Sequence, residues 1–204
     1  MKFYNSPLGP NPQVVRMFMA EKGITIPKAD IDIAAGENRK EPYLSKNPMG
    51  TVPALELDDG SCVSEITAIC EYLEEKHPSP ALVGTTAEER VKTRMWTRRI
   101  DLNIVQPMTD AFHFGEGLLL FRNRLFCIPE AAAGLKELAQ RNLTWLDKQM
   151  GKNEFIAGSR ISLADILLYP ALSSFGAMGQ PLNKDNKWIA AWYERMAARP
   201  SAKA

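Results

Sequence analysis

Strand-like and helix-like patterns alternate over the first part of the chain. Residues Lys2–Ser6 form a short strand pattern, and the proline-rich segment Pro7–Pro12 leads into a helix pattern over Gln13–Lys22. The apolar side chains of this helix fall on one face, and Gly23 favours its end. The apolar positions on that face are Val14, Val15, Phe18 and Met19.

The pattern continues with short elements up to residue 76. Apolar and acidic residues alternate over Ala29–Ile33, which predicts a second strand, and the polar stretch Gly36–Lys46 is expected to hold a short helix. Val52–Leu57 and Cys62–Ser64 flank an Asp-Asp-Gly turn and predict an antiparallel hairpin. A helix over Glu65–Lys76 follows, so the order β-α-β-α-β-β-α describes a small sheet covered by helices.

Beyond residue 77 only helical patterns remain. The segment His77–Thr86 carries two prolines and a glycine, so we predict a domain of residues 1–77, a linker over 78–86 and a second domain over 87–204. Apolar residues at helical spacing in the second domain make it all-α. The predicted helices cover Ala87–Phe114, Pro129–Met150, a segment starting near Leu163, and Asp185–Ala198.

Composition and charge exclude several classes of function. With 25 basic and 24 acidic side chains among 204 residues, the chain lacks the positive excess expected of a nucleic-acid or anionic-membrane binder. No apolar run reaches the ~18 residues of a membrane span, and the N-terminus lacks a signal-peptide pattern. Three cysteines without paired spacing predict reduced thiols and a cytoplasmic protein. His77 and His113 lack ligand spacing, so we expect no metal site.

Pro53 stands at the head of a predicted strand, where a residue without an N–H is tolerated. If the Val52–Pro53 bond is cis, the N–H and C=O of Val52 can face outward and pair with an extended peptide as an added strand would. A trans proline in an ordinary loop is the alternative. The pattern therefore favours a peptide as ligand.

Two segments around this proline carry a family resemblance. The sequence NPMGTVPAL over Asn47–Leu55, followed by a hairpin and by SEITAICEYLE over Ser64–Glu74, resembles the glutathione-binding half of the cytosolic glutathione transferases. A third segment, Ala157–Asp165, resembles the N-capping box of their helical domain. There Ser162 caps a helix and Asp165 reaches back to its N–H, with Ile161 and Ile166 as the hydrophobic staple. The resemblance is to the bacterial type, with no class assigned, and spans nearly the whole chain.

The resemblance implies an α/β thioredoxin-like N-terminal domain that binds glutathione, an all-α C-terminal helical domain that binds the electrophile, and a homodimer. The main chain of Val52 with Pro53 would pair with the cysteinyl unit of glutathione. The acid Glu65 would pair with the ammonium, and the helix start with the γ-glutamyl carboxylate. Many relatives have a serine after this acid, whereas this chain has Ile66 and keeps only its N–H. The glycine carboxylate would meet Asn38, Arg39 and Lys40. A solvated cluster of surface charges is an equally good interpretation of these residues.

Catalysis requires the thiolate, and relatives place a donor for it in the first strand-to-helix loop. With the helix starting at Pro12, Asn11 becomes the N-cap and its amide can also donate to the sulfur. Asn11 acting only as a cap is the alternative, Ser6 is the second candidate, and Tyr4 fits packing better. The loop contains no cysteine, which argues against the thiol-transfer subgroup that forms a mixed disulfide.

For the electrophile pocket we single out Asn103, Phe112 and His113, although a helix-bundle core explains each of them equally. The sequence therefore predicts a transferase of detoxification that activates glutathione for attack on a hydrophobic electrophile. A glutathione-dependent peroxidase or disulfide reductase is an alternative enzyme. A non-catalytic binding or assembly module of the same fold is an alternative from another class.

Overall fold

The computed structural model describes residues 1–204 and divides into two compact units. Unit 1 comprises Met1–Thr85 together with Pro200–Ala204, and unit 2 comprises Thr86–Arg199. Each unit has its own secondary structure, mixed α/β in unit 1 and helical in unit 2. No helix is long and apolar enough to cross a membrane.

A four-stranded mixed sheet forms the centre of unit 1. Its order is β2-β1-β3-β4, with β1 parallel to β2 and antiparallel to β3, and with β3 antiparallel to β4. The predicted element order β-α-β-α-β-β-α and the predicted antiparallel hairpin are both confirmed. The strands are β1 (Lys2–Asn5), β2 (Lys28–Asp30), β3 (Ala54–Glu56) and β4 (Cys62–Ser64).

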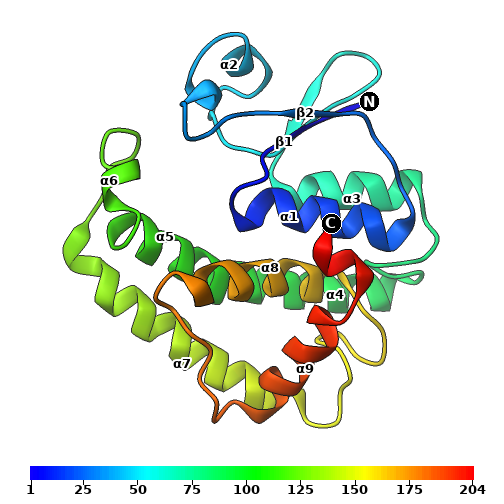
Figure 1. The fold of residues 1–204 in the computed structure, drawn as a ribbon. Helices are drawn as coiled ribbons and strands as arrows, with labels where there is room; N and C mark the ends of the chain where they lie inside the picture. The colour runs from blue at the N-terminus through cyan, green and yellow to red at the C-terminus, as the bar shows by residue number, and fades with distance from the viewer. The chain divides into compact units, whose positions relative to one another are not determined.

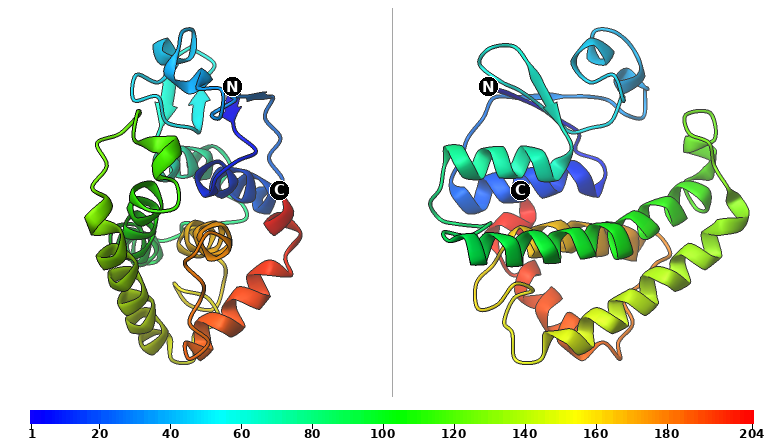
Figure 2. Two further views of the ribbon diagram at one scale, coloured as in Figure 1. Left: turned by 60° about the vertical axis from the view of Figure 1, so that its left-hand side comes forward. Right: turned by 180° about the vertical axis from the view of Figure 1, so that it is seen from behind.

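Helices lie on both sides of this sheet. In Figure 1 and Figure 2, α1 (Pro10–Lys22) and α3 (Ile66–Lys76) lie side by side along one face, and the loop carrying α2 (Tyr43–Lys46) lies beyond the other. Successive residues of β1 point to opposite faces: Phe3 is fully buried in the core, whereas the Tyr4 ring meets Tyr43 of α2 edge-on at 5.7 Å. A short 3-10 helix, η1 (Glu37–Arg39), precedes α2. These layers confirm the predicted thioredoxin-like fold.

The first helix begins earlier than the sequence analysis predicts. Gly9 is the N-cap of α1, with a φ of 85°, and Pro10 is its first residue. Prolines at positions 10 and 12 both fit, because the first N–H groups of a helix have no partner inside it. The prediction that Asn11 caps a helix starting at Pro12 is therefore wrong, since Asn11 is the second residue of α1.

Unit 2 is entirely helical, as predicted. The expected long helix over Ala87–Phe114 is one helical path with a π-helical turn inside it, and α5 then packs extensively against α7. Figure 2 shows α6 at the tip of the α5–α7 pair. The elements are α4 (Ala87–Ile100), η2 (Asp101–Val105), α5 (Gln106–Phe114), α6 (Leu118–Phe121), η3 (Pro129–Ala131), α7 (Ala132–Met150), α8 (Leu163–Ala177) and α9 (Lys187–Ala197).

The predicted capping box at the start of α8 is present. The Asp165 carboxylate is fully buried and accepts from the Ser162 N–H at 2.9 Å and the Ser162 hydroxyl at 2.7 Å. It also accepts from the Ile156 N–H at 2.9 Å and from Nε1 of Trp192 at 2.8 Å. The box thus joins the loop before α8 to α9, so its role goes beyond a helix cap.

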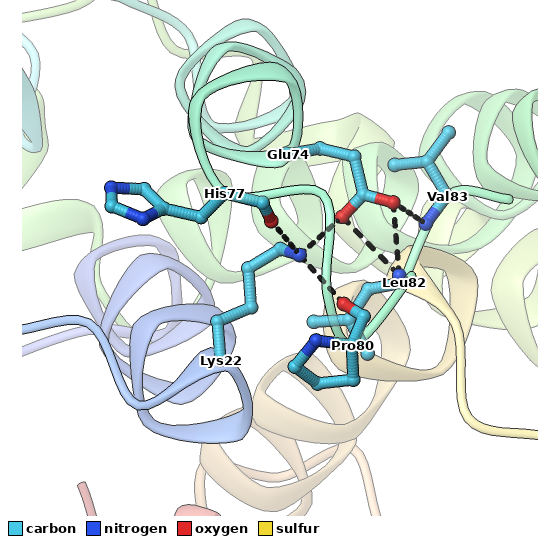
Figure 3. A network of polar contacts seen from close by, with 6 residues as sticks. All are labelled: Lys22, Glu74, His77, Pro80, Leu82 and Val83. Carbon is cyan, nitrogen blue, oxygen red and sulfur yellow. Dashed lines mark hydrogen bonds and ion pairs between the residues drawn. The ribbon is translucent and has the colours of Figure 1, made fainter. Parts of the chain in front are cut away.

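The segment predicted as a linker belongs largely to unit 1. Figure 3 shows the Lys22 ammonium between the Glu74 carboxylate at 2.7 Å and two carbonyls, those of His77 at 2.6 Å and Pro80 at 2.7 Å. The Glu74 carboxylate accepts hydrogen bonds from the N–H groups of Leu82 and Val83, at 2.9–3.2 Å. One buried ion pair therefore holds this stretch of chain against α1 and α3.

The last residues leave the helical unit. The sequence analysis assigns residues 87–204 to one domain, but Pro200–Ala204, which we call the C-terminal strap, packs on α1. The strap contains the 3-10 helix η4 (Pro200–Lys203), with Ser201 and Ala202 buried. Unit 1 is therefore built from two separate stretches of sequence.

Candidate functional site

Three segments of unit 1 meet at one end of its sheet. Ala54 pairs with Tyr4 on one side and with Ser64 on the other. The chain before Ala54 therefore lies between the end of β1 and the end of β4. Those ends lead into α1 and α3, so Val52 and Pro53 lie between the starts of two helices.

The main chain of Val52 is available for pairing. The β3 ladder begins at Ala54, and neither polar group of Val52 takes part in the turn and loop hydrogen bonds. The Val52–Pro53 bond is cis, which is one of the two alternatives that the sequence analysis leaves open. Pro53 is buried, whereas Val52 is half-buried. An unpaired N–H and C=O beside a sheet form a site at which an extended peptide can add as a strand.

The start of α3 supplies donors next to that strand. The first hydrogen bond of α3 runs from the Ile69 N–H to the carbonyl of the cap residue Glu65, at 3.0 Å. The N–H groups of Ile66, Thr67 and Ala68 therefore have no partner within the helix. Glu65 has a φ of 71°, the one positive value among residues other than glycine. Such a backbone costs about 1–3 kcal/mol and is found mainly at functional sites. The Glu65 side chain is exposed and makes no hydrogen bond inside the chain, which leaves its carboxylate available to a cation.

The segment before Val52 is held by buried amides. Nδ2 of Asn38 donates to the Gly50 carbonyl at 2.6 Å, and Asn38 is only 8% exposed. A Cβ on Gly50 would come within 2.8 Å of the Asn38 carbonyl, so only glycine fits this turn. Arg39 and Lys40 are exposed, and each donates to a main-chain oxygen of a nearby residue, that of Met49 at 3.5 Å and that of Ala35 at 3.4 Å. Asn38 therefore builds the turn, and the exposed cations are the groups within this cluster that can reach a carboxylate.

The first loop separates the two candidates for the thiol donor. Asn11 is partly exposed, and its side chain makes no hydrogen bond in the chain. Because Pro10 and Pro12 have no N–H, Asn11 carries the one free main-chain donor among the first three residues of α1. Ser6 is 1% exposed, and its hydroxyl accepts the Leu8 N–H at 3.3 Å. The geometry thus favours Asn11 over Ser6.

Tyr4 is committed to another partner. Its hydroxyl donates to the Glu56 carboxylate at 2.6 Å, and this bond, with burial and the Glu56 charge, raises the pKa of Tyr4 to about 12. Lys46 pairs with the same carboxylate at 3.1 Å. A tyrosine held in this way acts in packing between the sheet and α2, as the sequence analysis proposed.

In unit 2, two of the three pocket candidates lie in one aromatic cluster. The rings of Phe112 and His113 are 6.1 Å apart, and both meet Phe121 of α6, at 6.0 and 4.0 Å. Burial lowers the pKa of His113, partly opposed by the charge of Asp110. A half-buried imidazole among aromatic rings suits a hydrophobic ligand with a polar group.

The third pocket candidate lies elsewhere. Asn103 is exposed on the π-helical turn η2, where its side chain donates to the Arg99 carbonyl at 2.8 Å. Its own carbonyl accepts from Asn142 of α7 at 2.8 Å, so its contacts are structural. Nothing in the structure brings Asn103 to the aromatic cluster of unit 2.

Two features of these sites had no clear sequence signal. The positive φ of Glu65 is unexpected, because glutamate rarely adopts it. Phe175 of α8 completes the aromatic cluster at 5.9 Å from Phe112, although helical spacing alone marks it as ordinary core. Gly117 permits this packing, since a Cβ there would lie 2.9 Å from the Phe112 ring. No group of three or more potential metal ligands forms in the chain.

Comparisons with known proteins agree with this arrangement. The family profile described as glutathione S-transferase, N-terminal domain, matches residues 8–76, and the C-terminal domain profile matches residues 129–195. These two matches and a relative that is 31% identical over the whole of this chain establish that the chain belongs to the glutathione S-transferase family.

The chain is 31% identical to glutathione S-transferase 2 of Saccharomyces cerevisiae over 100% of its own length and 88% of the relative's. A solved glutathione S-transferase domain-containing protein from Marinobacter aquaeolei superposes with a TM-score of 0.91 at 35% identity, over 99% and 100% of the two chains. Elongation factor 1-gamma of Carassius auratus is 31% identical over 66% of this chain, which corresponds to 28% of that protein.

Proposed function

We propose that this protein is a glutathione transferase that holds glutathione on unit 1 and activates its thiol for attack on a hydrophobic electrophile. The attack forms a sulfur–carbon bond and releases the leaving group from the carbon. The observation that carries the proposal is the unpaired main chain of Val52 between the starts of α1 and α3. A tripeptide can pair with it while its charged ends meet groups of opposite charge.

Each part of glutathione has a matching group in this cluster. The γ-glutamyl carboxylate matches the free N–H groups at the start of α3, and the ammonium matches the Glu65 carboxylate. The glycine carboxylate matches Arg39 and Lys40, which are exposed beside the Asn38 turn. The cysteinyl unit matches the Val52 main chain.

Activation of the thiol is assigned to the start of α1. An ordinary thiol pKa of about 8.5 leaves a few per cent thiolate at neutral pH, and lowering it by two units requires about 2.7 kcal/mol. The Asn11 amide and its main-chain N–H are two donors at a positive helix end, which together are of that order. Catalysis then comes from a stabilised, positioned thiolate. The second substrate is assigned to the Phe112–His113 cluster of unit 2.

Substitution of Asn11 tests the assignment. Asn11→Ala removes the side-chain donor and keeps the main chain, so turnover of a chloronitrobenzene with glutathione should fall about tenfold, as expected for one directed hydrogen bond. The thiol pKa of bound glutathione, measured by thiolate absorbance, should rise. Gln13→Ala, also near the start of α1, should change neither. An unchanged rate and thiol pKa in the Asn11 variant would remove that residue from the mechanism.

A non-catalytic module is the second candidate. Ile66 lacks the hydroxyl that the resemblance leads one to expect, and part of the chain is similar to elongation factor 1-gamma. The observation that separates the two is retention on immobilised glutathione together with turnover. A protein that shows neither activity acts as a module, and one that shows both is the transferase.

The proposal extends to assembly and location. Proteins of this family are generally dimers, so we propose a homodimer in the cytoplasm, with no nucleic acid or membrane as partner. Sedimentation at micromolar concentration tests the dimer, and a monomer there would contradict it.

A further inference from the structure

One arginine connects the first loop to the C-terminal strap. Arg16 lies on α1, and its Nη1 donates to Oδ1 of Asn5 at 2.7 Å and to the Ser6 carbonyl at 2.8 Å. Its Nε donates to the main-chain oxygen of Ala204 at 3.1 Å. The guanidinium is half-buried, and burial lowers its pKa while the Asp30 charge opposes this. A single cation therefore joins the end of β1 to residues from the other end of the chain.

The contacts at the end of β1 are themselves fixed. Asn5 is 5% exposed, and its Nδ2 donates to the Asp30 carboxylate at 2.6 Å. Its carbonyl accepts the Ile31 N–H at 2.8 Å. With Oδ1 bound to Arg16, the Asn5 side chain is anchored on both sides. The four residues from Ser6 to Gly9 then lead directly to the start of α1, so Arg16 holds the base of the loop that presents Asn11.

The strap contacts three side chains of α1, those of Gln13, Arg16 and Glu21. Ser201 donates to Glu21, and Nε2 of Gln13 donates to the Ala202 carbonyl at 3.2 Å. Gln13 makes no bond to the first loop. Arg16, by contrast, binds both the strap and the loop.

We propose that Arg16 is a positioning residue for thiol activation and that the C-terminal strap holds Arg16 in place. This inference rests on the proposed function, because it concerns the loop assigned to the sulfur. A charge-assisted bond from a half-buried guanidinium is strong and directional. Small displacements of a donor weaken its hydrogen bond to a reacting atom. Loss of the Arg16 contacts should therefore displace Asn11 and weaken its hydrogen bond to the glutathione sulfur.

Three variants test the inference against one another. Arg16→Gln removes the guanidinium. Deletion of Lys203 and Ala204 removes its strap acceptor together with the last residue of η4. The matched control is Gln13→Ala, which removes a strap contact at Ala202 and leaves every bond of Arg16 in place. In the ligand-free protein, hydrogen exchange of the Leu8 and Ile31 N–H groups, which bond to Ser6 and to Asn5, should accelerate about tenfold in Arg16→Gln and several-fold in the deletion. Exchange in Gln13→Ala should equal that of the unmodified protein.

Glutathione provides the second measurement. The thiol pKa of bound glutathione should rise in Arg16→Gln and, by less, in the deletion, with kcat reduced more than KM is raised. A purely structural role would lower the melting temperature without moving the thiol pKa. Unchanged loop exchange and thiol pKa in Arg16→Gln would overturn the positioning role, and unchanged values in the deletion would overturn the part of the strap.

The outcomes also separate this inference from the proposed function. If the unmodified protein does not bind glutathione, the proposed function fails, while the exchange measurement still tests the link between strap and loop. If Arg16→Gln does not fold, Arg16→Lys tests the positioning role in its place, and the two-residue deletion still tests the part of the strap. Arg16→Lys, which keeps the charge, should restore part of the slow exchange.

Discussion

Separating Lys22 from Glu74 should destabilise unit 1 far more than separating an exposed ion pair. The Lys22 side chain is 0% exposed and that of Glu74 is 10% exposed, at a distance of 2.7 Å. Lys22→Met leaves a buried carboxylate without its cation and leaves the carbonyls of His77 and Pro80 without a donor. Glu74→Gln turns an amide N–H₂ or a neutral oxygen toward the ammonium.

The magnitude follows from burial. Removing one partner of a buried ion pair costs about 3–5 kcal/mol, because the remaining charge is left uncompensated. At about 2–4 °C per kcal/mol for a protein of this size, the melting temperature of either variant should fall by at least ~6 °C. The double variant should cost less than the sum of the two, because it leaves no unpaired charge.

Urea unfolding of the two single variants and the double variant measures these values. The control is Arg141→Met, which breaks the Arg141–Glu137 pair, whose side chains are 77% and 63% exposed. Exposed pairs contribute about 0–1 kcal/mol, so the control should be nearly neutral. Single variants that cost no more than the control, or costs that add in the double variant, would refute the reasoning.

Two further predictions concern the cluster of unit 1 and the capping box of unit 2. Ile66→Ser places a hydroxyl at the start of α3. KM for glutathione should fall about fivefold or more, because one hydrogen bond to a charged group is gained. An unchanged KM would mean that the γ-glutamyl carboxylate binds elsewhere. Asp165→Asn keeps one acceptor oxygen but turns its N–H₂ group toward the N–H of Ser162. The free energy of unfolding, measured in urea, should therefore fall by about 2–4 kcal/mol. A fall of less than ~1 kcal/mol would contradict the capping role of Asp165.

Short-range patterns explain what the sequence could predict. The capping box of Ser162 and Asp165 is a local motif with a local geometry, and the structure contains it. The hairpin between β3 and β4 follows from a turn signal flanked by apolar residues. The position of Pro53 at a strand head makes the Val52–Pro53 bond a candidate for the cis form, and the bond is cis.

Features that depend on distant residues or on single backbone angles escaped prediction. The sequence pattern predicts that α1 starts at Pro12, because a proline fits the first helical position. Pro10 fits that position equally well, and α1 starts there, directly after Gly9 with its positive φ. The conformation of Glu65 has no signal in its residue type. The bond from Arg16 to Ala204 joins residues 188 positions apart, and no periodicity reveals such a contact.

The return of Pro200–Ala204 to unit 1 bears on how the protein is made. A ribosome delivers residues 1–85 first, and domains generally fold as units during synthesis. Here Ser201 and Ala202, which become buried in the finished unit, leave the ribosome only after the whole helical unit has been translated. Unit 1 therefore cannot reach its final packing until translation has passed residue 204.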